Sequence, residues 1–144
     1  MTPLQIALTL AGLVAFATVL GLVWRWQNGR TRLTDGRDVL TTGDLGTALG
    51  TTATLVQFSS QICAPCRSTH AVLSSIADAS ASSGVTHVDL DIVANEPLTR
   101  RFNVLQTPTT LILDAHGAVR ARIGGAARAT DVRAHLATLT DSFS

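Results

Sequence analysis

The two cysteines of the chain, Cys63 and Cys66, are separated by two residues. At this spacing their sulfurs can face each other across the first turn of a helix, close enough for a disulfide to form and break. A hydrophobic run at residues 54–58 comes just before the pair, and a helical pattern follows it. A Cys-x-x-Cys pair at a junction between a strand and a helix is typical of redox chemistry.

The apolar pattern from residue 54 onward predicts the elements that must position this pair. They are a strand at 54–59, a helix from the cysteines to residue 79, a strand at 85–92, a short helix ending at residue 102, strands at 109–113 and 118–123, and a final helix. The first strand, helix and strand predict a right-handed parallel crossover, and the last two strands predict an antiparallel hairpin. This order indicates an α/β fold.

Polar residues ahead of apolar runs predict where the helices begin. Asp44 is the predicted cap of a short helix, Asn95 of the helix with Pro97 in its first turn, and Thr130 of the last helix. Residues 39–40 are predicted as an edge strand. The buried stripe of the last helix is predicted to consist of Val132, Leu136 and Leu139.

Residues 3–23 carry no charged side chain, and about 20 such residues cross the hydrocarbon core of a bilayer. Trp24 and Trp26 follow where an interfacial aromatic belt would lie. A cleaved signal peptide is the alternative, but it would have a basic start, a shorter apolar run and a small-x-small cleavage site. We therefore predict a single uncleaved transmembrane anchor at residues 1–26.

The charges around this span predict its orientation in the cell membrane. No basic residue precedes it, whereas four arginines follow it closely: Arg25, Arg30, Arg32 and Arg37. The positive-inside rule therefore places the following domain in the cytoplasm. The extracytoplasmic side stays open, since many membrane-tethered redox domains face outward. Residues 27–37 are polar, contain two glycines and are predicted to be a linker to a domain at 38–144.

The composition excludes two other classes of protein. A formal net charge of +1, with no basic patch interleaved with aromatic residues, gives no basis for nucleic-acid binding. Two cysteines are too few for a disulfide-rich secreted scaffold.

From residue 54 to residue 139 the chain resembles the thioredoxin family. The resemblance rests on the motif Cys63-Ala64-Pro65-Cys66, on Thr107-Pro108 ahead of a strand, and on a closing hairpin followed by a glycine pair. It implies a thioredoxin-like fold, a central mixed sheet flanked by helices, here preceded by one transmembrane helix. Residues 106–114 also resemble the membrane-tethered thioredoxins of cytochrome maturation, although the 42 residues from Cys66 to Pro108 leave no room for their usual insertion.

The resemblance implies a role for each residue of the motif. Cys63 is expected to be the attacking nucleophile, because the free N–H groups at a helix start stabilise a thiolate, and Cys66 is expected to resolve the mixed disulfide. Pro65 fixes the start of the helix. No cofactor is implied besides the redox-active disulfide. The implied partners are protein thiols and disulfides and an upstream electron-donor protein.

Three further positions are expected to support the exchange reaction. A cis Pro108 would hold the backbone of Thr107 opposite the sulfurs, where it can pair with an extended substrate segment. Arg67 is either a solvated surface charge or a group that attracts partners.

The sequence departs from the usual thioredoxin pattern near the cysteines. Gln57 stands where family members carry a buried aspartate, so another base or water must accept the proton of Cys66. Ser59 and Ile62 replace the usual aromatic residues, and Ala64 replaces a glycine. These differences predict a narrower set of partners.

The resulting hypothesis is a membrane-anchored protein-disulfide reductase in cell redox homeostasis. The direction of exchange stays open, because it depends on the reduction potential of the pair relative to its compartment. The alternative is a module for cytochrome assembly or copper delivery that uses Cys63, Cys66 and His70, although a fourth ligand is missing. The remaining histidines are predicted at the surface, and Asp89 and Asp91 are not expected to form an acid–base pair.

Overall fold

The computed structural model describes residues 2–27 and 31–141, and of residues 24–27 it describes the backbone alone. The predicted aromatic belt of Trp24 and Trp26 therefore concerns side chains outside the described residues. The same holds for the charges of Arg25 and Arg30.

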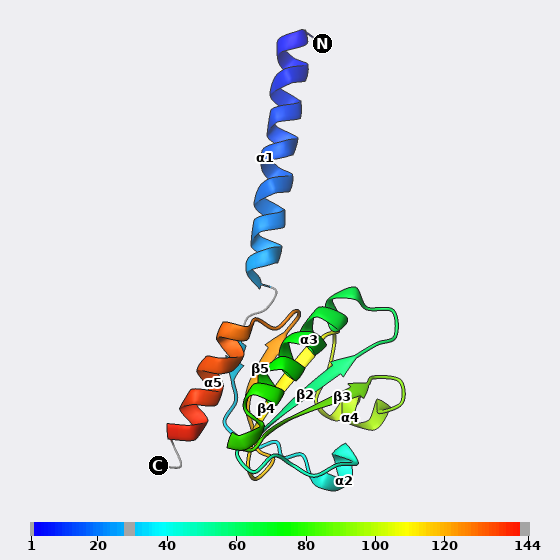
Figure 1. Cartoon of the computed structure of the whole chain (residues 1–144). Coiled ribbons are helices and arrows are strands. Elements are labelled where there is room, and N and C mark those ends of the chain that lie inside the picture. The colour runs from blue at the N-terminus through cyan, green and yellow to red at the C-terminus, as the bar shows by residue number, and fades with distance from the viewer. Residues whose placement is uncertain (1, 28–30, 142–144) are drawn as a thin grey trace.

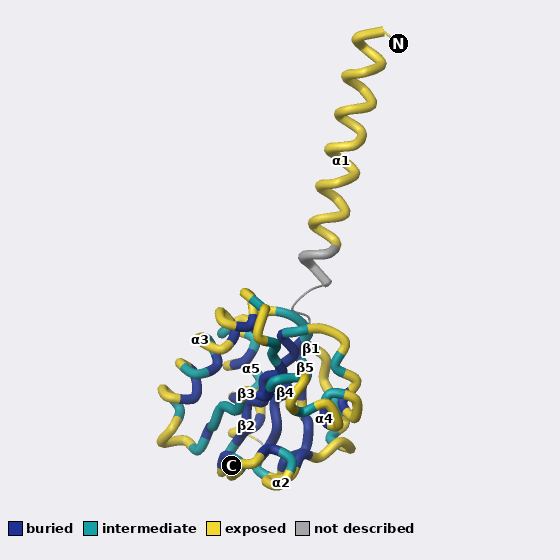
Figure 2. Tube along the Cα trace, turned by 90° about the vertical axis from the view of Figure 1, so that its right-hand side faces the viewer, coloured by how far each residue is buried: buried dark blue, intermediate teal, exposed yellow. Residues whose placement is uncertain are grey.

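Helix α1 (Pro3–Gln27) contains an apolar segment, Pro3–Val23, that is long enough and apolar enough to cross a membrane. None of this segment is buried in the structure, and α1 extends away from the rest of the chain (Figure 1, Figure 2). A signal sequence near the N-terminus can meet the same criteria of length and hydropathy. The helix is therefore a candidate membrane span.

A five-stranded mixed sheet forms the centre of the remaining chain, with the strand order β1-β5-β4-β2-β3 (Figure 1). Its members are β1 (Thr31–Leu33), β2 (Ala53–Ser59), β3 (Val85–Asp91), β4 (Thr109–Asp114) and β5 (Val119–Gly124). β2 and β3 run parallel, and every other neighbouring pair is antiparallel. Because three successive pairs are antiparallel, β1 enters the sheet at the end where β2 leaves it.

Helices cover both faces of the sheet. Within residues 31–141, five helical segments lie outside α1: α2 (Thr42–Leu45), α3 (Ala64–Ala79), the short 3₁₀ helix η1 (Ala81–Ser83), α4 (Glu96–Arg101) and α5 (Ala129–Asp141). One hydrophobic cluster joins α3 and α5 to the sheet through residues such as Leu55, Leu73 and Leu136. The opposite cluster joins α2 and α4 to it through residues such as Leu45, Phe58 and Leu98.

Strand β2 is buried on both faces from Ala53 to Phe58. Leu55 belongs to the cluster under α3 and α5, whereas Val56 and Phe58 belong to the opposite one. Gln57 lies two residues after Leu55 and therefore faces α3, because alternate side chains of a strand point to the same face. The chain leaves β2 at Ser59 and begins α3 after Cys63.

The element order confirms the predicted thioredoxin-like α/β fold. β2, α3 and β3 form the parallel crossover, and β4 and β5 form the closing hairpin. The predicted stripe of α5 is buried as well: Val132, Leu136 and Leu139.

The predicted edge strand at residues 39–40 is wrong, since only an isolated bridge joins Val39 to Ala118. The edge strand is instead β1, which pairs with β5 and lies within the predicted linker. Its sequence, Thr31-Arg32-Leu33, has no apolar alternation, because it has one antiparallel neighbour and is mostly exposed. Pairing with β5 through the backbone is a tertiary contact that the side-chain pattern does not record.

Two predicted caps are also corrected. Thr41, not Asp44, caps α2: its hydroxyl accepts the Asp44 N–H, and the Asp44 carboxylate accepts the Thr41 N–H in return. Thr130 lies inside α5, which begins at Ala129. Asn95 does precede α4, but its side chain donates to the Asp91 carbonyl instead of capping the first turn.

Candidate active site

Cys63 and Cys66 are joined by a disulfide at the start of α3. Their Cα atoms are 5.2 Å apart, within the usual range for such a bond. The Cys63 sulfur also accepts a hydrogen bond from the Cys66 backbone N–H at 3.2 Å. Cys63 is half-buried, whereas Cys66 is 3% exposed. An incoming thiol or disulfide therefore reaches the sulfur of Cys63 first.

The first turn of α3 suits a reactive sulfur. Pro65 lies in this turn, where the N–H that proline lacks would have no intrahelical acceptor. The remaining N–H groups make the helix start locally positive, which stabilises a thiolate at Cys63. Ala64, Pro65 and Arg67 have exposed side chains. These three of the predicted supporting residues thus lie on the surface beside the reactive pair.

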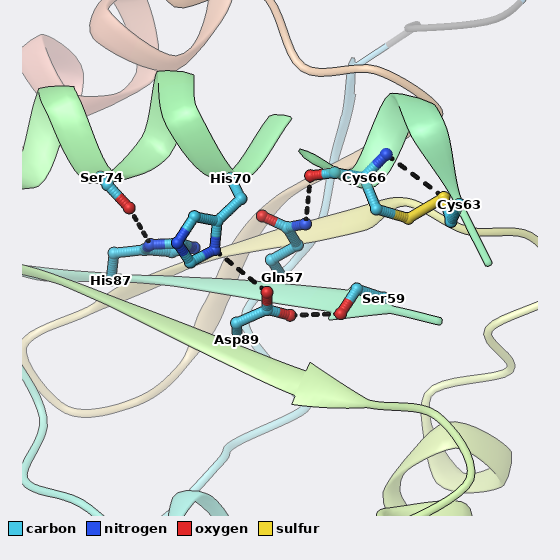
Figure 3. A network of polar contacts seen from close by, with 8 residues as sticks. All are labelled: Gln57, Ser59, Cys63, Cys66, His70, Ser74, His87 and Asp89. Atoms are coloured by element: carbon cyan, nitrogen blue, oxygen red, sulfur yellow. Dashed lines mark hydrogen bonds and ion pairs between the residues drawn. A yellow bond between two sulfur atoms is a disulfide. The ribbon is translucent and has the colours of Figure 1, made fainter. Parts of the chain in front are cut away.

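Gln57 lies beneath the second cysteine. It is fully buried, and its Nε2 donates to the Cys66 carbonyl at 3.0 Å (Figure 3). Its other amide atom, Oε1, is buried without a hydrogen-bond partner among the described residues. Gln57 therefore ties the first turn of α3 to β2 and leaves one acceptor unused.

The Thr107–Pro108 peptide bond is cis, as predicted. Pro108 is buried, and its carbonyl accepts the Gly125 N–H at 2.8 Å. The Thr107 hydroxyl lies 3.4 Å from the hydroxyl of Ser60, in the segment between β2 and Cys63. The structure thus brings the two predicted substrate-binding residues next to the segment that carries the reactive pair.

A pocket of about 200 Å³, lined mainly by residues with polar side chains, opens beside the disulfide. Its lining consists of Ser59, Ser60, Gln61, Cys63, Cys66, Arg67, His70 and Asp89. On one side of it, Asp89 accepts a hydrogen bond from Ser59 and lies 3.0 Å from His70 Nδ1 (Figure 3). The disulfide therefore shares a pocket with a carboxylate and an imidazole.

The polar contacts continue from His70 along the sheet. The His87 ring lies edge-on to the His70 ring, with centroids 4.9 Å apart, and His87 Nδ1 is 3.1 Å from the Ser74 hydroxyl (Figure 3). Burial lowers the pKa of His87, and the charge of a protonated His70 lowers it further, against a smaller opposite effect of Asp89 and Asp78. Burial and the neighbouring His70 therefore both favour the neutral form of the half-buried His87 imidazole.

A family model described as Thioredoxin matches residues 44–138, about two thirds of the chain. The chain belongs to the thioredoxin family. Its chemistry is accordingly thiol–disulfide exchange, and such a domain needs no cofactor besides its redox-active disulfide.

Solved thioredoxin structures share the fold of this thioredoxin domain. Thioredoxin from Fasciola hepatica is 24% identical, with 62% of this chain and 82% of that chain covered and a TM-score of 0.53. Chloroplastic thioredoxin z is 22% identical, with 63% and 80% covered and a TM-score of 0.56. Mitochondrial thioredoxin 3 from Saccharomyces cerevisiae is 20% identical, with 60% and 78% covered and a TM-score of 0.52. No curated protein sequence matches the chain.

The metal-delivery alternative finds no support within residues 2–27 and 31–141. No group of three His, Cys, Asp or Glu among them could hold a metal ion. His70, the third ligand in that hypothesis, directs its Nδ1 to the Asp89 carboxylate.

Sequence reasoning missed Asp89 and placed His87 at the surface, whereas His87 is half-buried in this thioredoxin domain. The signal that could have found them is the parallel pairing of β2 with β3, which puts Asp89 beside Gln57 and His87 beside Leu55. His70 lies one helical turn after Cys66 and faces the same strand. Aligning β3 with β2 in register and placing α3 over them would have identified the cluster of Asp89, His70 and His87.

His87 predicts how stability changes with pH. Because its pKa is lower in the folded protein than in the unfolded chain, the unfolded chain binds more protons below the unfolded value of about 6.5. We expect the contribution of His87 to the free energy of unfolding to be constant above that pH and to fall as the pH decreases below it. Urea unfolding followed by circular dichroism should show a weaker dependence for His87→Asn than for His135→Asn, a half-buried control on α5. Equal slopes would contradict the assignment.

Proposed function

We propose that the chain is a membrane-anchored protein-disulfide reductase that acts by dithiol–disulfide exchange in cell redox homeostasis. The observation that carries this proposal is the Cys63–Cys66 disulfide at a helix start, with one accessible and one buried sulfur. A partly exposed attacking sulfur and a protected second sulfur suit a reaction that passes through a mixed disulfide.

In the proposed reaction the dithiol form starts the cycle. The Cys63 thiolate attacks one sulfur of a partner disulfide, and the other partner sulfur leaves as a thiolate that takes up a proton. Cys66 then loses its proton and attacks the Cys63 sulfur, which releases the second partner thiol and re-forms the Cys63–Cys66 disulfide. Two electrons pass to the partner in each cycle, and an upstream electron-donor protein returns them.

The surface around Cys63 is proposed to hold the partner. The backbone of Thr107, ahead of Pro108, pairs with an extended partner segment, as strand addition would allow. The exposed guanidinium of Arg67 attracts acidic side chains near the partner disulfide. Ala64 and Pro65 shape the first turn, and Gln57 holds it against β2.

Residues 1–26 are proposed to form a single membrane anchor, with the thioredoxin domain on the cytoplasmic side. Support for the anchor comes from the apolar segment Pro3–Val23, of which none is buried in the structure. The arginines that follow the span support the orientation. Since β1 lies in the predicted linker, the domain in this proposal begins at residue 31, and residues 27–30 form the linker.

The catalytic roles of the cysteines can be tested by trapping. We expect Cys66→Ser to accumulate mixed disulfides with partner proteins through Cys63, because the resolving thiol is gone. Cys63→Ser, with the buried Cys66 as its remaining thiol, should form almost none. Non-reducing electrophoresis after acid quenching measures both. Equal adduct levels in the two variants, or no reduction of a model disulfide by the wild-type protein, would refute the reductase proposal.

The membrane side can be tested in intact cells with a membrane-impermeant maleimide. For a cytoplasmic domain, Cys63 in Cys66→Ala should react after lysis only. Thr2→Cys in a variant without Cys63 and Cys66 should react in intact cells, because residue 2 would lie on the opposite side. Reaction of Cys63 in intact cells would place the domain outside, and loss of the Thr2→Cys label from the mature chain would indicate a cleaved signal sequence.

A further inference from the structure

The resolving step requires a proton acceptor that this chain does not carry at the usual position. Cys66 is almost fully buried, and burial disfavours its thiolate. Its buried neighbour Gln57 has an amide side chain, which cannot take up a proton near neutral pH. An acceptor for the Cys66 proton must therefore come from another side chain or from solvent.

The pocket beside the disulfide limits the candidates. Of its lining residues outside the cysteines, the serines and Gln61 are not bases, and Arg67 stays protonated. This leaves Asp89 and His70, which contact each other at 3.0 Å. Both are accessible to water, with side-chain exposures of 32% for Asp89 and 52% for His70.

The sheet register favours Asp89. Gln57 and Asp89 are direct partners in the parallel pair of β2 and β3, so their side chains lie next to each other on the face that α3 covers. Gln57 in turn contacts the carbonyl of Cys66. The pocket is lined mainly by residues with polar side chains and is large enough to hold water molecules that would connect Asp89 with the Cys66 thiol.

Building on the proposed function, we propose that Asp89 is the acceptor for the Cys66 proton and replaces a buried acid at the position of Gln57. Asp89 takes the proton through pocket water, the Cys66 thiolate attacks the Cys63 sulfur, and the partner leaves as a thiolate. The proton then returns from Asp89 to the partner thiolate or to solvent. Ser59 and His70 are positioning residues that hold the carboxylate toward the pocket.

The charges around Asp89 are few. Arg67 and His70 face it from α3, and its own strand carries His87 two residues before it and Asp91 two residues after it. β2 contributes Gln57 and Ser59, which do not titrate. Of these groups, His70 is in direct contact with the Asp89 carboxylate.

The test separates the two steps of exchange. The reduced full chain in detergent is mixed with an excess of an aromatic disulfide that releases a coloured thiol twice, first on attack by Cys63 and then on resolution by Cys66. In Asp89→Asn we expect the second release to slow by about 100-fold at neutral pH, a loss at the low end for a general base, while the first release changes little. The rate of the second release in Asp89→Asn should then rise about tenfold per pH unit, because hydroxide must take the proton of Cys66.

Three variants are the controls. Asp91→Asn makes the same charge change on the same strand outside the pocket, and an asparagine oxygen can still accept the N–H groups of Val93 and Ala94, so its second phase should match the wild type. Asp89→Glu keeps a carboxylate and should retain most of the rate. Gln57→Asp combined with Asp89→Asn should restore the second phase, because it returns an acid to the neighbouring strand.

Two results would overturn the proposal. One is a second phase in Asp89→Asn with the rate and pH dependence of Asp91→Asn. The other is a loss confined to His70→Asn, which would assign the proton to His70. Failure of the first release in the wild-type protein would refute the proposed exchange function itself.

A second inference rests on the path of the chain into the sheet and on the proposed anchor. β1 enters at Thr31, which pairs with Ile123, and Ile123 pairs with Thr110 beside the Pro108 loop. Thr110 in turn pairs with Gln57. Thr31 thus lies at the redox end of the sheet, three strand spacings or about 14 Å across it from Gln57.

The chain between α1 and β1 is short. Three residues separate Gln27 from Thr31, so the Cα atoms of these two residues are at most about 15 Å apart. The opposite end of the sheet, where β3 begins after η1, is about 20 Å farther along the strands. We infer that the anchor holds the redox end of the domain toward the lipid surface, and that the preferred partners are disulfides in membrane-proximal segments of membrane proteins.

Energy transfer from the domain to labelled lipid tests this geometry. The full chain is reconstituted in phosphatidylcholine vesicles that contain a headgroup acceptor, with the donor dye on Cys63 in Cys66→Ala. The comparison carries the dye at Ser82→Cys, an exposed η1 position, without the native cysteines. We expect about twofold higher transfer from Cys63, since it would lie about 20 Å nearer the lipid. Equal or reversed transfer in vesicle-bound protein would overturn this inference alone, and failure to bind vesicles would overturn the proposed anchor with it.

Discussion

The burial of β2 on both faces is the constraint on which the rest of the structure depends. Every side chain from Ala53 to Phe58 is shielded, so the strand can lie only between two neighbours and beneath helices on both sides. The position of its C-terminal end, at one end of the strands of the sheet, is therefore fixed. The next segment crosses to α3 within a few residues, and Cys63 takes its position from that crossing.

The same burial shapes the chemistry around the second cysteine. A carboxylate at the position of Gln57 would be removed from water, and an unpaired buried charge is costly. A neutral amide avoids this cost and still bonds the Cys66 carbonyl. The neighbouring strand carries a carboxylate at Asp89. Its side chain is partly exposed to water, and Ser59 and His70 form polar contacts with it. In the proposed mechanism the proton acceptor thus lies on β3, at a position accessible to water, and not at the buried position of Gln57 on β2.

The position of β1 links this site to the N-terminal helix. An edge strand antiparallel to β5 has its first residue at the end of the sheet where β2 ends and where the Pro108 loop lies. In the proposed anchored protein, a short linker attached there keeps the reactive sulfur on the side of the domain that faces the lipid. Attachment at the opposite end would direct the same domain away from the lipid. In the proposed anchored arrangement, the direction of one three-residue strand therefore decides which partners the domain meets first.

The sequence by itself determined the redox pair, the order of elements from β2 to α5, the cis Pro108 loop and the apolar N-terminal helix. These features depend on local spacing, on runs of apolar residues and on a motif, all of which can be read along the chain. Only the tertiary structure decided the edge strand at Thr31–Leu33, the cap at Thr41 and the cluster of Asp89, His70 and His87 beside the disulfide. Strand register and helix packing bring these side chains together from distant positions, and backbone pairing at an exposed edge leaves no hydrophobic pattern.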